Sequence, residues 1–126
     1  MKFTVDRSKW YRGKDGLGSR LLIGKSEPYA GMMCCLGFRA IEAGHTKKYI
    51  EGKAYPGAIE DKKPEAWKGF ARGGVETNIC LRIIRTNDSP KLKERDRESK
   101  LRTLFAKLGD QIKFVGRTPK GFFSRD

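Results

Sequence analysis

The sequence of 126 residues lacks any run of 18 or more apolar residues. A helix that crosses a bilayer needs about 20 such residues, so we expect no membrane partner. The first ten residues, MKFTVDRSKW, also lack the apolar stretch of a secretory signal, which favours a cytoplasmic location. Apolar residues still make up 37% of the chain, which excludes a fully disordered protein and fits one domain with its own core.

Cysteine and histidine are also scarce, with three cysteines and one histidine in the chain. The odd cysteine count argues against a disulfide framework. The residues Cys34, Cys35, His45 and Cys80 lack the C-x-x-C and H-x-x-x-H spacings that are typical of metal sites. We therefore expect no metal site and no cofactor.

Cys35 has a functional interpretation, because it falls in the first turn of a predicted helix. The partial positive charge at that position favours a reactive thiolate. A cysteine-dependent enzyme also needs a base, and His45 lies ten residues further on, about 15 Å away along the same helix. Cys34 and Cys35 are therefore interpreted first as small packing residues.

Acidic residues are few, since 15 Asp and Glu stand against 28 Lys and Arg, for a formal net charge of +13. The last 50 residues hold thirteen basic and six acidic side chains, a net of +7. Such an excess predicts attraction to polyanions, nucleic acid above all, especially at low salt. The competing interpretation is a soluble basic protein whose charge serves no partner.

Hydrophobic periodicity predicts the main elements. Alternating polar and apolar residues predict strands at Lys2–Asp6 and Ile112–Val115, and a short apolar run predicts a third strand at Arg20–Ile23. Apolar residues three and four positions apart predict helices over Met32–Ala43 and Lys91–Leu108.

Local signals refine the helices. Ser89 and Pro90 offer a cap and a first-turn proline for the last helix. The segment Thr77–Thr86 fits both a strand alternation and a helical stripe, and the capping residues at its ends favour the helix. Gly37 lies inside a predicted helix, where glycine costs up to about 1 kcal/mol relative to alanine, so we expect another backbone to approach closely there.

Together these elements predict one compact α+β domain over residues 1–116. We expect a small antiparallel or mixed sheet packed against two or three helices. Residues 117–126 are expected to form a basic flexible tail. Much of the core should come from Cys34, Leu36, Leu101, Leu104 and Phe105.

Two clusters of basic and aromatic residues flank the predicted first and last strands. Basic side chains bind phosphates and aromatic rings stack on bases, and pairing of the two strands would bring the clusters together. The alternative places Trp10 and Tyr11 in the core and leaves the tail frayed. The expected anion-binding residues are Lys9, Arg12, Lys14, Arg20, Arg117, Lys120 and Arg125, with Tyr11 and Phe122 for stacking.

The predicted helix Lys91–Leu108 is also rich in basic residues, but acidic residues are interleaved with them. Asp96 with Lys100 and Glu98 with Arg102 are four positions apart, a spacing that favours ion pairs along a helix. A solvated face whose charges pair with one another is the better interpretation of this helix. Recognition of a partner by the helix is secondary.

The order of several segments resembles a group of small accessory proteins encoded by tailed bacteriophages. The resemblance covers roughly residues 3–116, and it implies a setting in the host cytoplasm. It carries no established activity and therefore no functional residues. The segments are Arg7-Ser8-Lys9-Trp10, Arg12-Gly13, Ser19-Arg20-Leu21-Leu22, Met33-Cys34-Cys35-Leu36-Gly37-Phe38, Asn87-Asp88, Leu104-Phe105-Ala106-Lys107-Leu108-Gly109 and Ile112-Lys113-Phe114-Val115.

The favoured hypothesis is a non-enzymatic protein that binds an anionic partner, nucleic acid or a nucleotide. Its binding surface would combine the glycine-rich loop after Arg12 with the basic tail. The first alternative is an inhibitor that binds a host or anti-phage defence protein. The second alternative is a cysteine-dependent enzyme that uses Cys35, and the oligomeric state is left open.

Overall fold

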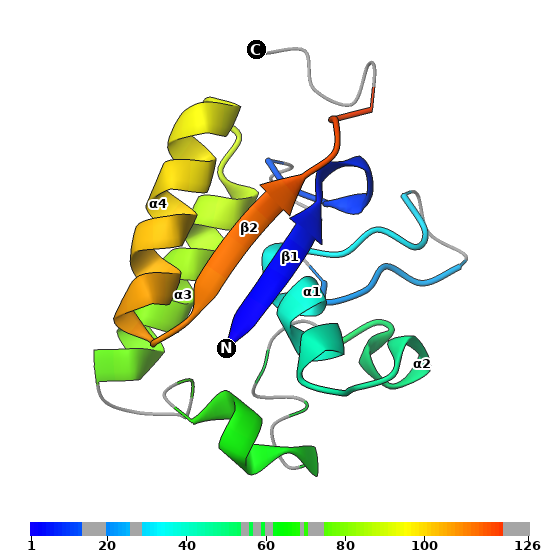
Figure 1. Ribbon diagram of the computed structural model, residues 1–126. Helices are drawn as coiled ribbons and strands as arrows, with labels where there is room; N and C mark the ends of the chain where they lie inside the picture. Colours follow the sequence, from blue (N-terminus) through cyan, green and yellow to red (C-terminus); the bar gives the residue numbers. More distant parts are fainter. Residues whose placement is uncertain are drawn as a thin grey trace.

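The computed structural model describes residues 1–13, 20–25, 29–53, 56, 59, 62–68, 70 and 75–119, and only the backbone of 75–78. These residues form two strands and four α-helices (Figure 1), which confirms the α+β class. None of the helices in this described part is long and apolar enough to cross a membrane. The elements are β1 (Lys2–Asp6), α1 (Cys35–Glu42), α2 (Lys47–Ile50), α3 (Val75–Asp88), α4 (Glu94–Lys107) and β2 (Gln111–Val115).

The two strands form a parallel pair, with Lys2 beside Gln111 and Asp6 beside Val115. The expectation of an antiparallel or mixed sheet is therefore wrong. Parallel strands need a long crossover between them, and here the helices between the first and last elements supply it. Figure 1 shows the result, in which β1 and β2 lie side by side with α1 next to β1 and α4 next to β2.

The segment Arg20–Ile23 is not a strand of this sheet, although its backbone is extended and bonded. The amide of Leu21 donates to the carbonyl of Lys53 at 2.8 Å, and the amide of Ile23 donates to that of Met32 at 2.9 Å. The apolar run is buried as expected. Its backbone groups are satisfied by neighbouring loops instead of by β1 or β2, which corrects the three-stranded prediction.

The helices lie where the sequence predicts them, but some begin or end at other residues. The ambiguous segment Thr77–Thr86 is helical within α3. The last helix begins at Glu94 and not near Ser89, whose hydroxyl accepts a hydrogen bond from the amide of Lys91 at 3.3 Å. Because α3 runs on to Asp88, the residues after it are needed to turn the chain back into α4.

The core lies between the inner face of the sheet and the helices. Phe3 and Val5 of β1 and Ile112 and Phe114 of β2 are buried on this face, while the alternate residues are exposed on the other. The ring of Phe3 meets that of Phe105 of α4 edge-on, with centroids 5.1 Å apart. All of the expected core residues are buried: Cys34, Leu36, Leu101, Leu104 and Phe105.

His45 is a buried hydrogen-bond acceptor at the end of the domain that carries α2. The indole N–H of Trp67 donates to its Nε2 at 2.9 Å, and His45 is 6% exposed. Burial, with a contribution from the charge of Lys63, lowers the pKa of His45 below its ordinary value of 6.5. Folding therefore favours the neutral imidazole of His45 over its protonated form.

We expect this histidine to make the fold sensitive to mild acid. Its contribution to stability is fully present above about pH 6.5 and is lost as the pH falls toward the lowered folded-state pKa, because only the unfolded chain takes up the proton. Urea unfolding at pH 7.5 and pH 5.5 tests it against His45→Gln, whose amide oxygen can still accept from Trp67. The unchanged protein should lose more stability than the variant, and equal losses would contradict the prediction.

Candidate functional site

The parallel pairing of β1 and β2 does bring together the chain segments that follow the two strands. Nη1 of Arg7 donates to the carbonyl of Gly116 at 3.0 Å, and Nη2 of Arg12 donates to Oγ1 of Thr118 at 2.6 Å. Among the expected binding residues near this end, Lys9 and Arg117 are exposed and Arg20 is half-buried. The others lie outside the described residues: Lys14, Lys120, Phe122 and Arg125.

Arg12 is placed differently from the sequence-based expectation, because its side chain is fully buried. The guanidinium lies over the ring of Trp10, 4.2 Å from the centroid, and it pairs with Glu94. It also donates to the carbonyl oxygens of Trp10 at 2.7 Å and Arg7 at 3.2 Å. A guanidinium whose donors are all directed at the protein holds loops together and offers nothing to a phosphate.

Tyr11 does not form a stacking platform either. Its side chain is 1% exposed, and its ring packs against that of Tyr29 with centroids 5.4 Å apart. Trp10 is completely buried. For these two aromatic residues the structure supports the alternative interpretation, in which they belong to the interior.

Cys35 sits at the first turn of α1, as expected, but in surroundings that disfavour a thiolate. It is completely buried, and burial together with neighbouring Cys34 raises its pKa well above the usual range. Desolvation thus outweighs the helix dipole. Among the described residues no cluster of His, Cys, Asp and Glu could hold a metal ion. Cys34 and Cys35 serve as packing residues at this site.

The candidate site is a groove between α3 and α4, which pack side by side and are joined by the short connection 89–93. Side chains three or four positions apart on a helix share a face, so each helix presents one row to the groove. The groove has a volume of about 310 Å³. Its lining residues are Arg82, Arg85 and Thr86 from α3 and Ser99, Lys100, Thr103 and Leu104 from α4.

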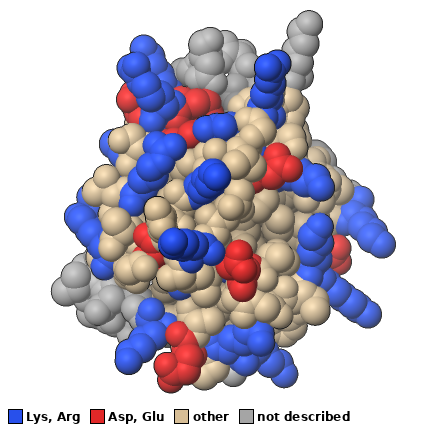
Figure 2. All heavy atoms as spheres, viewed as in Figure 1, with Lys and Arg blue, Asp and Glu red and all other residues tan. Residues whose placement is uncertain are grey.

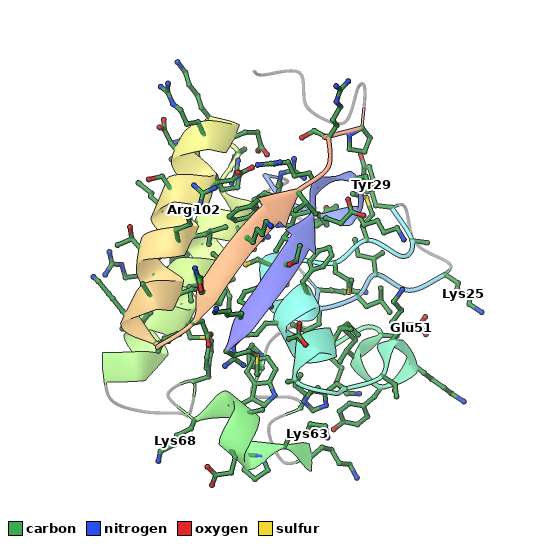
Figure 3. The ribbon with its side chains drawn as sticks, viewed as in Figure 1. Lys25, Tyr29, Glu51, Lys63, Lys68 and Arg102 are labelled. Atoms are coloured by element: carbon green, nitrogen blue, oxygen red, sulfur yellow. The ribbon has the colours of Figure 1, made fainter. Side chains whose placement is uncertain are left out.

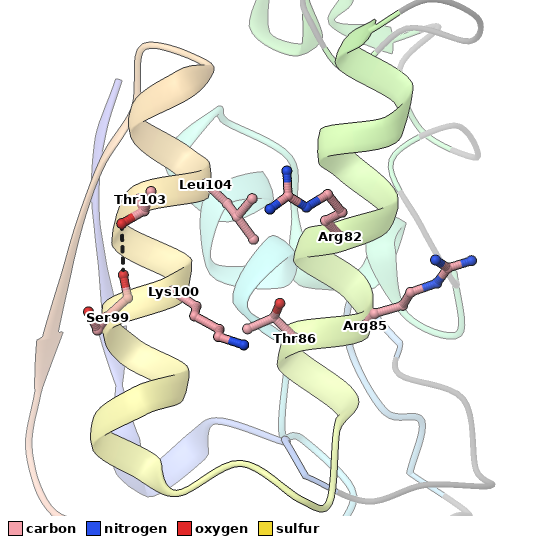
Figure 4. A pocket seen from close by; sticks show the side chains of 7 residues that line it. All are labelled: Arg82, Arg85, Thr86, Ser99, Lys100, Thr103 and Leu104. Carbon is pink, nitrogen blue, oxygen red and sulfur yellow. Dashed lines mark hydrogen bonds between the residues drawn. The ribbon is translucent and has the colours of Figure 1, made fainter.

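Two cationic side chains project into the space between the helices (Figure 4). Arg82 extends from α3 toward Leu104, and Lys100 extends from α4 toward Thr86. Arg85 points away from α4 at the rim of the groove. Charges from both helices are thereby brought to one hollow with an apolar floor at Leu104, which is 4% exposed.

The chemistry of the groove suits an anion. No Asp or Glu lines it, and within the described part of the chain Arg82, Arg85 and Lys100 enter no ion pair. The hydroxyl of Ser99 adds a neutral donor, while that of Thr103 already donates to the Ser99 carbonyl at 3.2 Å. Cationic and hydroxyl donors around one hollow are the groups that bind phosphate oxygens.

The groove was not predicted from the sequence, because the alternating charges of α4 favour ion pairs within the helix. Glu98 does pair with Arg102 at 3.6 Å. Asp96, however, lies 3.9 Å from Arg95 and leaves Lys100 free for the groove. One signal was present for Arg82, since residues 78, 79, 85 and 86, its neighbours on the helix surface, include no acid.

Comparison with known proteins adds nothing to the interpretation of the groove. The two-stranded parallel sheet, the helical crossover and the cationic groove have to be explained by their own chemistry. No protein-family model, no curated protein and no solved structure matches this chain.

Proposed function

We propose that this protein binds nucleic acid or a nucleotide through phosphate groups held in the groove between α3 and α4. The observation that carries the proposal is that Arg82 and Lys100 project from facing helices into one hollow whose lining holds no carboxylate. Phosphate contacts supply most of the affinity of sequence-independent nucleic-acid binding. Of the loop-and-tail surface expected from the sequence, Arg12 and Tyr11 are buried, so we place the phosphate contacts in the groove.

Three other described arginines contrast with Arg82, because carboxylates of the protein pair with them. Arg7 pairs with Glu98 at 2.7 Å, and Arg97 pairs with Glu94 at 3.2 Å. Arg39 is 4% exposed and donates to Asp110 at 2.6 Å. The charges of these three arginines are therefore balanced by carboxylates of the protein, whereas Arg82 and Lys100 enter no ion pair among the described residues.

Replacing two groove cations together, as Arg82→Gln with Lys100→Gln, should weaken nucleic-acid binding by about 10- to 100-fold, because each lost phosphate contact forfeits counterion release. Fluorescence anisotropy of a labelled oligonucleotide in 50 mM NaCl measures the effect, with ATP as the nucleotide probe. Both side chains are exposed, so the variant should keep its far-UV circular dichroism and its unfolding midpoint.

Lys47→Gln with Lys48→Gln is the matched control, since both residues are exposed on α2 and the change in net charge is the same. The control should bind nearly as well as the unchanged protein. An equal loss in both variants would mean that net charge alone attracts the partner. The proposal fails if the unchanged protein retains neither probe at 50 mM NaCl, where electrostatic binding is strongest.

A further inference from the structure

A second hollow lies on the other side of α4, over the outer face of the sheet. It has a volume of about 530 Å³. The exposed alternate residues of the two strands form its floor, because strand side chains point to opposite faces in turn. Its lining residues are Lys2, Phe3, Thr4, Glu42, Arg102, Gln111, Ile112, Lys113 and Phe114.

This second hollow is also positively charged. Lys2 and Lys113 rise from neighbouring strands, and within the described residues neither enters an ion pair. Arg102 projects from α4 toward β2 (Figure 3), and its side chain is 53% exposed although it lies 3.6 Å from Glu98. Glu42 is the one acidic residue of the lining. Figure 2 shows this face with Lys and Arg spread over it and fewer acidic side chains between them.

The two hollows are separated by the width of one helix. Ser99, Thr103 and Ala106, at positions i, i+4 and i+7, are exposed small residues of α4, and Ser99 and Thr103 form the edge of the α3–α4 groove. Lys100 lies on the side of α4 that faces α3, and Arg102 on the side that faces β2. A helix with its side chains is about 10–12 Å across, and the major groove of B-form DNA is about 12 Å wide.

Among their described lining residues, neither hollow has an exposed aromatic ring on which a base could stack. The aromatic residues among the described lining residues are Phe3 and Phe114, which are 3% and 7% exposed on the inner face of the sheet. Proteins that bind single strands combine a basic groove with exposed aromatic rings on which bases stack. A duplex hides its bases and presents two rows of phosphates, so it needs cations alone.

We propose that the partner is a double-stranded nucleic acid laid across α4, with one phosphate backbone in the α3–α4 groove and the other over the outer face of the sheet. This inference rests on the proposed function and extends it to a second surface. Arg82 and Lys100 contact one strand, and Lys2 and Lys113 contact the other. The contacts are to phosphates, and recognition is independent of sequence.

The experiment compares a 20-base-pair DNA duplex with a single strand of the same length, by fluorescence anisotropy over a series of NaCl concentrations. The sheet variant is Lys2→Gln with Lys113→Gln, and the groove variant is Arg82→Gln with Lys100→Gln. The α2 double variant at Lys47 and Lys48 again controls for net charge. Removing two contacts should weaken duplex binding by about 10- to 100-fold in each test variant and lower the salt slope by about two.

The two proposals fail in different ways. If the sheet variant binds the duplex as tightly as the control while the groove variant is weakened, the second surface is wrong and the groove stands. A single strand that binds as tightly as the duplex overturns the choice of partner. If neither test variant differs from the control, or the unchanged protein binds neither DNA nor ATP, the proposed function falls as well. If it binds ATP but neither DNA, the duplex is wrong and the proposed function stands. Weakened duplex binding in both test variants, with the single strand bound less tightly, supports the inference.

Discussion

Replacing Asn87 by leucine should lower the free energy of unfolding by about 4 kcal/mol, out of the 5–15 kcal/mol that is usual for a domain. Asn87 is 1% exposed, and its Oδ1 accepts hydrogen bonds from the indole N–H of Trp10 at 2.7 Å and the amide of Cys35 at 3.1 Å. Its Nδ2 donates to the carbonyl of Tyr11 at 3.1 Å. Leucine has a similar volume, so the change removes the hydrogen bonds and leaves three buried groups unpaired, each at about 1–3 kcal/mol.

A double-mutant cycle with Trp10→Phe separates the hydrogen bonds from packing. In the Asn87→Leu protein the indole N–H of Trp10 is buried without its acceptor, and Trp10→Phe removes that N–H. The double variant should therefore be more stable than the sum of the two single losses predicts, by about 1–2 kcal/mol. Urea unfolding of the four proteins measures the coupling. A sum that is strictly additive would show that the hydrogen bond between Trp10 and Asn87 contributes nothing to stability.

The hydrogen bonds of Asn87 also join three segments that lie far apart in the sequence. Trp10 belongs to the first of these segments, Cys35 to the Cys-Cys-Leu-Gly segment and Asn87 to the late Asn-Asp pair. All three are buried. The segments thus meet in the interior, where they explain how the chain folds.

Strands and helices could be predicted wherever apolar residues recur at the spacing that places them on one buried face. The alternation around Phe3 and Val5, and around Ile112 and Phe114, predicts both strands, and the structure confirms them. Which distant segment pairs its backbone with a given strand could not be predicted in the same way. The apolar run at Arg20–Ile23 is as buried as a central strand, but its amides bond to loops, and a hydrophobic pattern does not specify which backbone will satisfy a buried amide.

The candidate site was harder to predict, because a charged residue in a sequence does not show what it pairs with. Arg12 stands beside glycine and aromatic residues, as a phosphate-binding arginine would, yet it is buried against Trp10 and Glu94. Arg82 and Lys100 stand in ordinary helical sequence and remain free among the described residues. The difference is decided by tertiary packing. Arg82 has no acid three or four positions away, whereas Lys100 has Asp96 four positions before it and still forms no ion pair among the described residues.

Gly37→Ala should destabilise the protein by about 3 kcal/mol, at the upper end of what overpacking usually costs. A Cβ at this position would overlap the carbonyl oxygen of Leu21 and lie 2.8 Å from Cβ of Met33 and 2.9 Å from the carbonyl carbon of Leu21. Leu21 cannot easily retreat, because its amide is bonded to Lys53 at 2.8 Å and the carbonyl of Arg20 accepts from Cys34 at 3.2 Å. The close approach expected from the sequence is confirmed.

The sign of this effect is informative, because alanine is favoured over glycine by about 1 kcal/mol inside a helix and also restricts the unfolded chain. A loss of stability must therefore come from the contact with Leu21. Gly24→Ala is the matched control, since its Cβ would lie 3.8 Å from Cγ of Glu51, an ordinary contact. Urea unfolding should show a change within about 1 kcal/mol for Gly24→Ala. If Gly37→Ala is as stable as that control, α1 does not depend on this backbone approach.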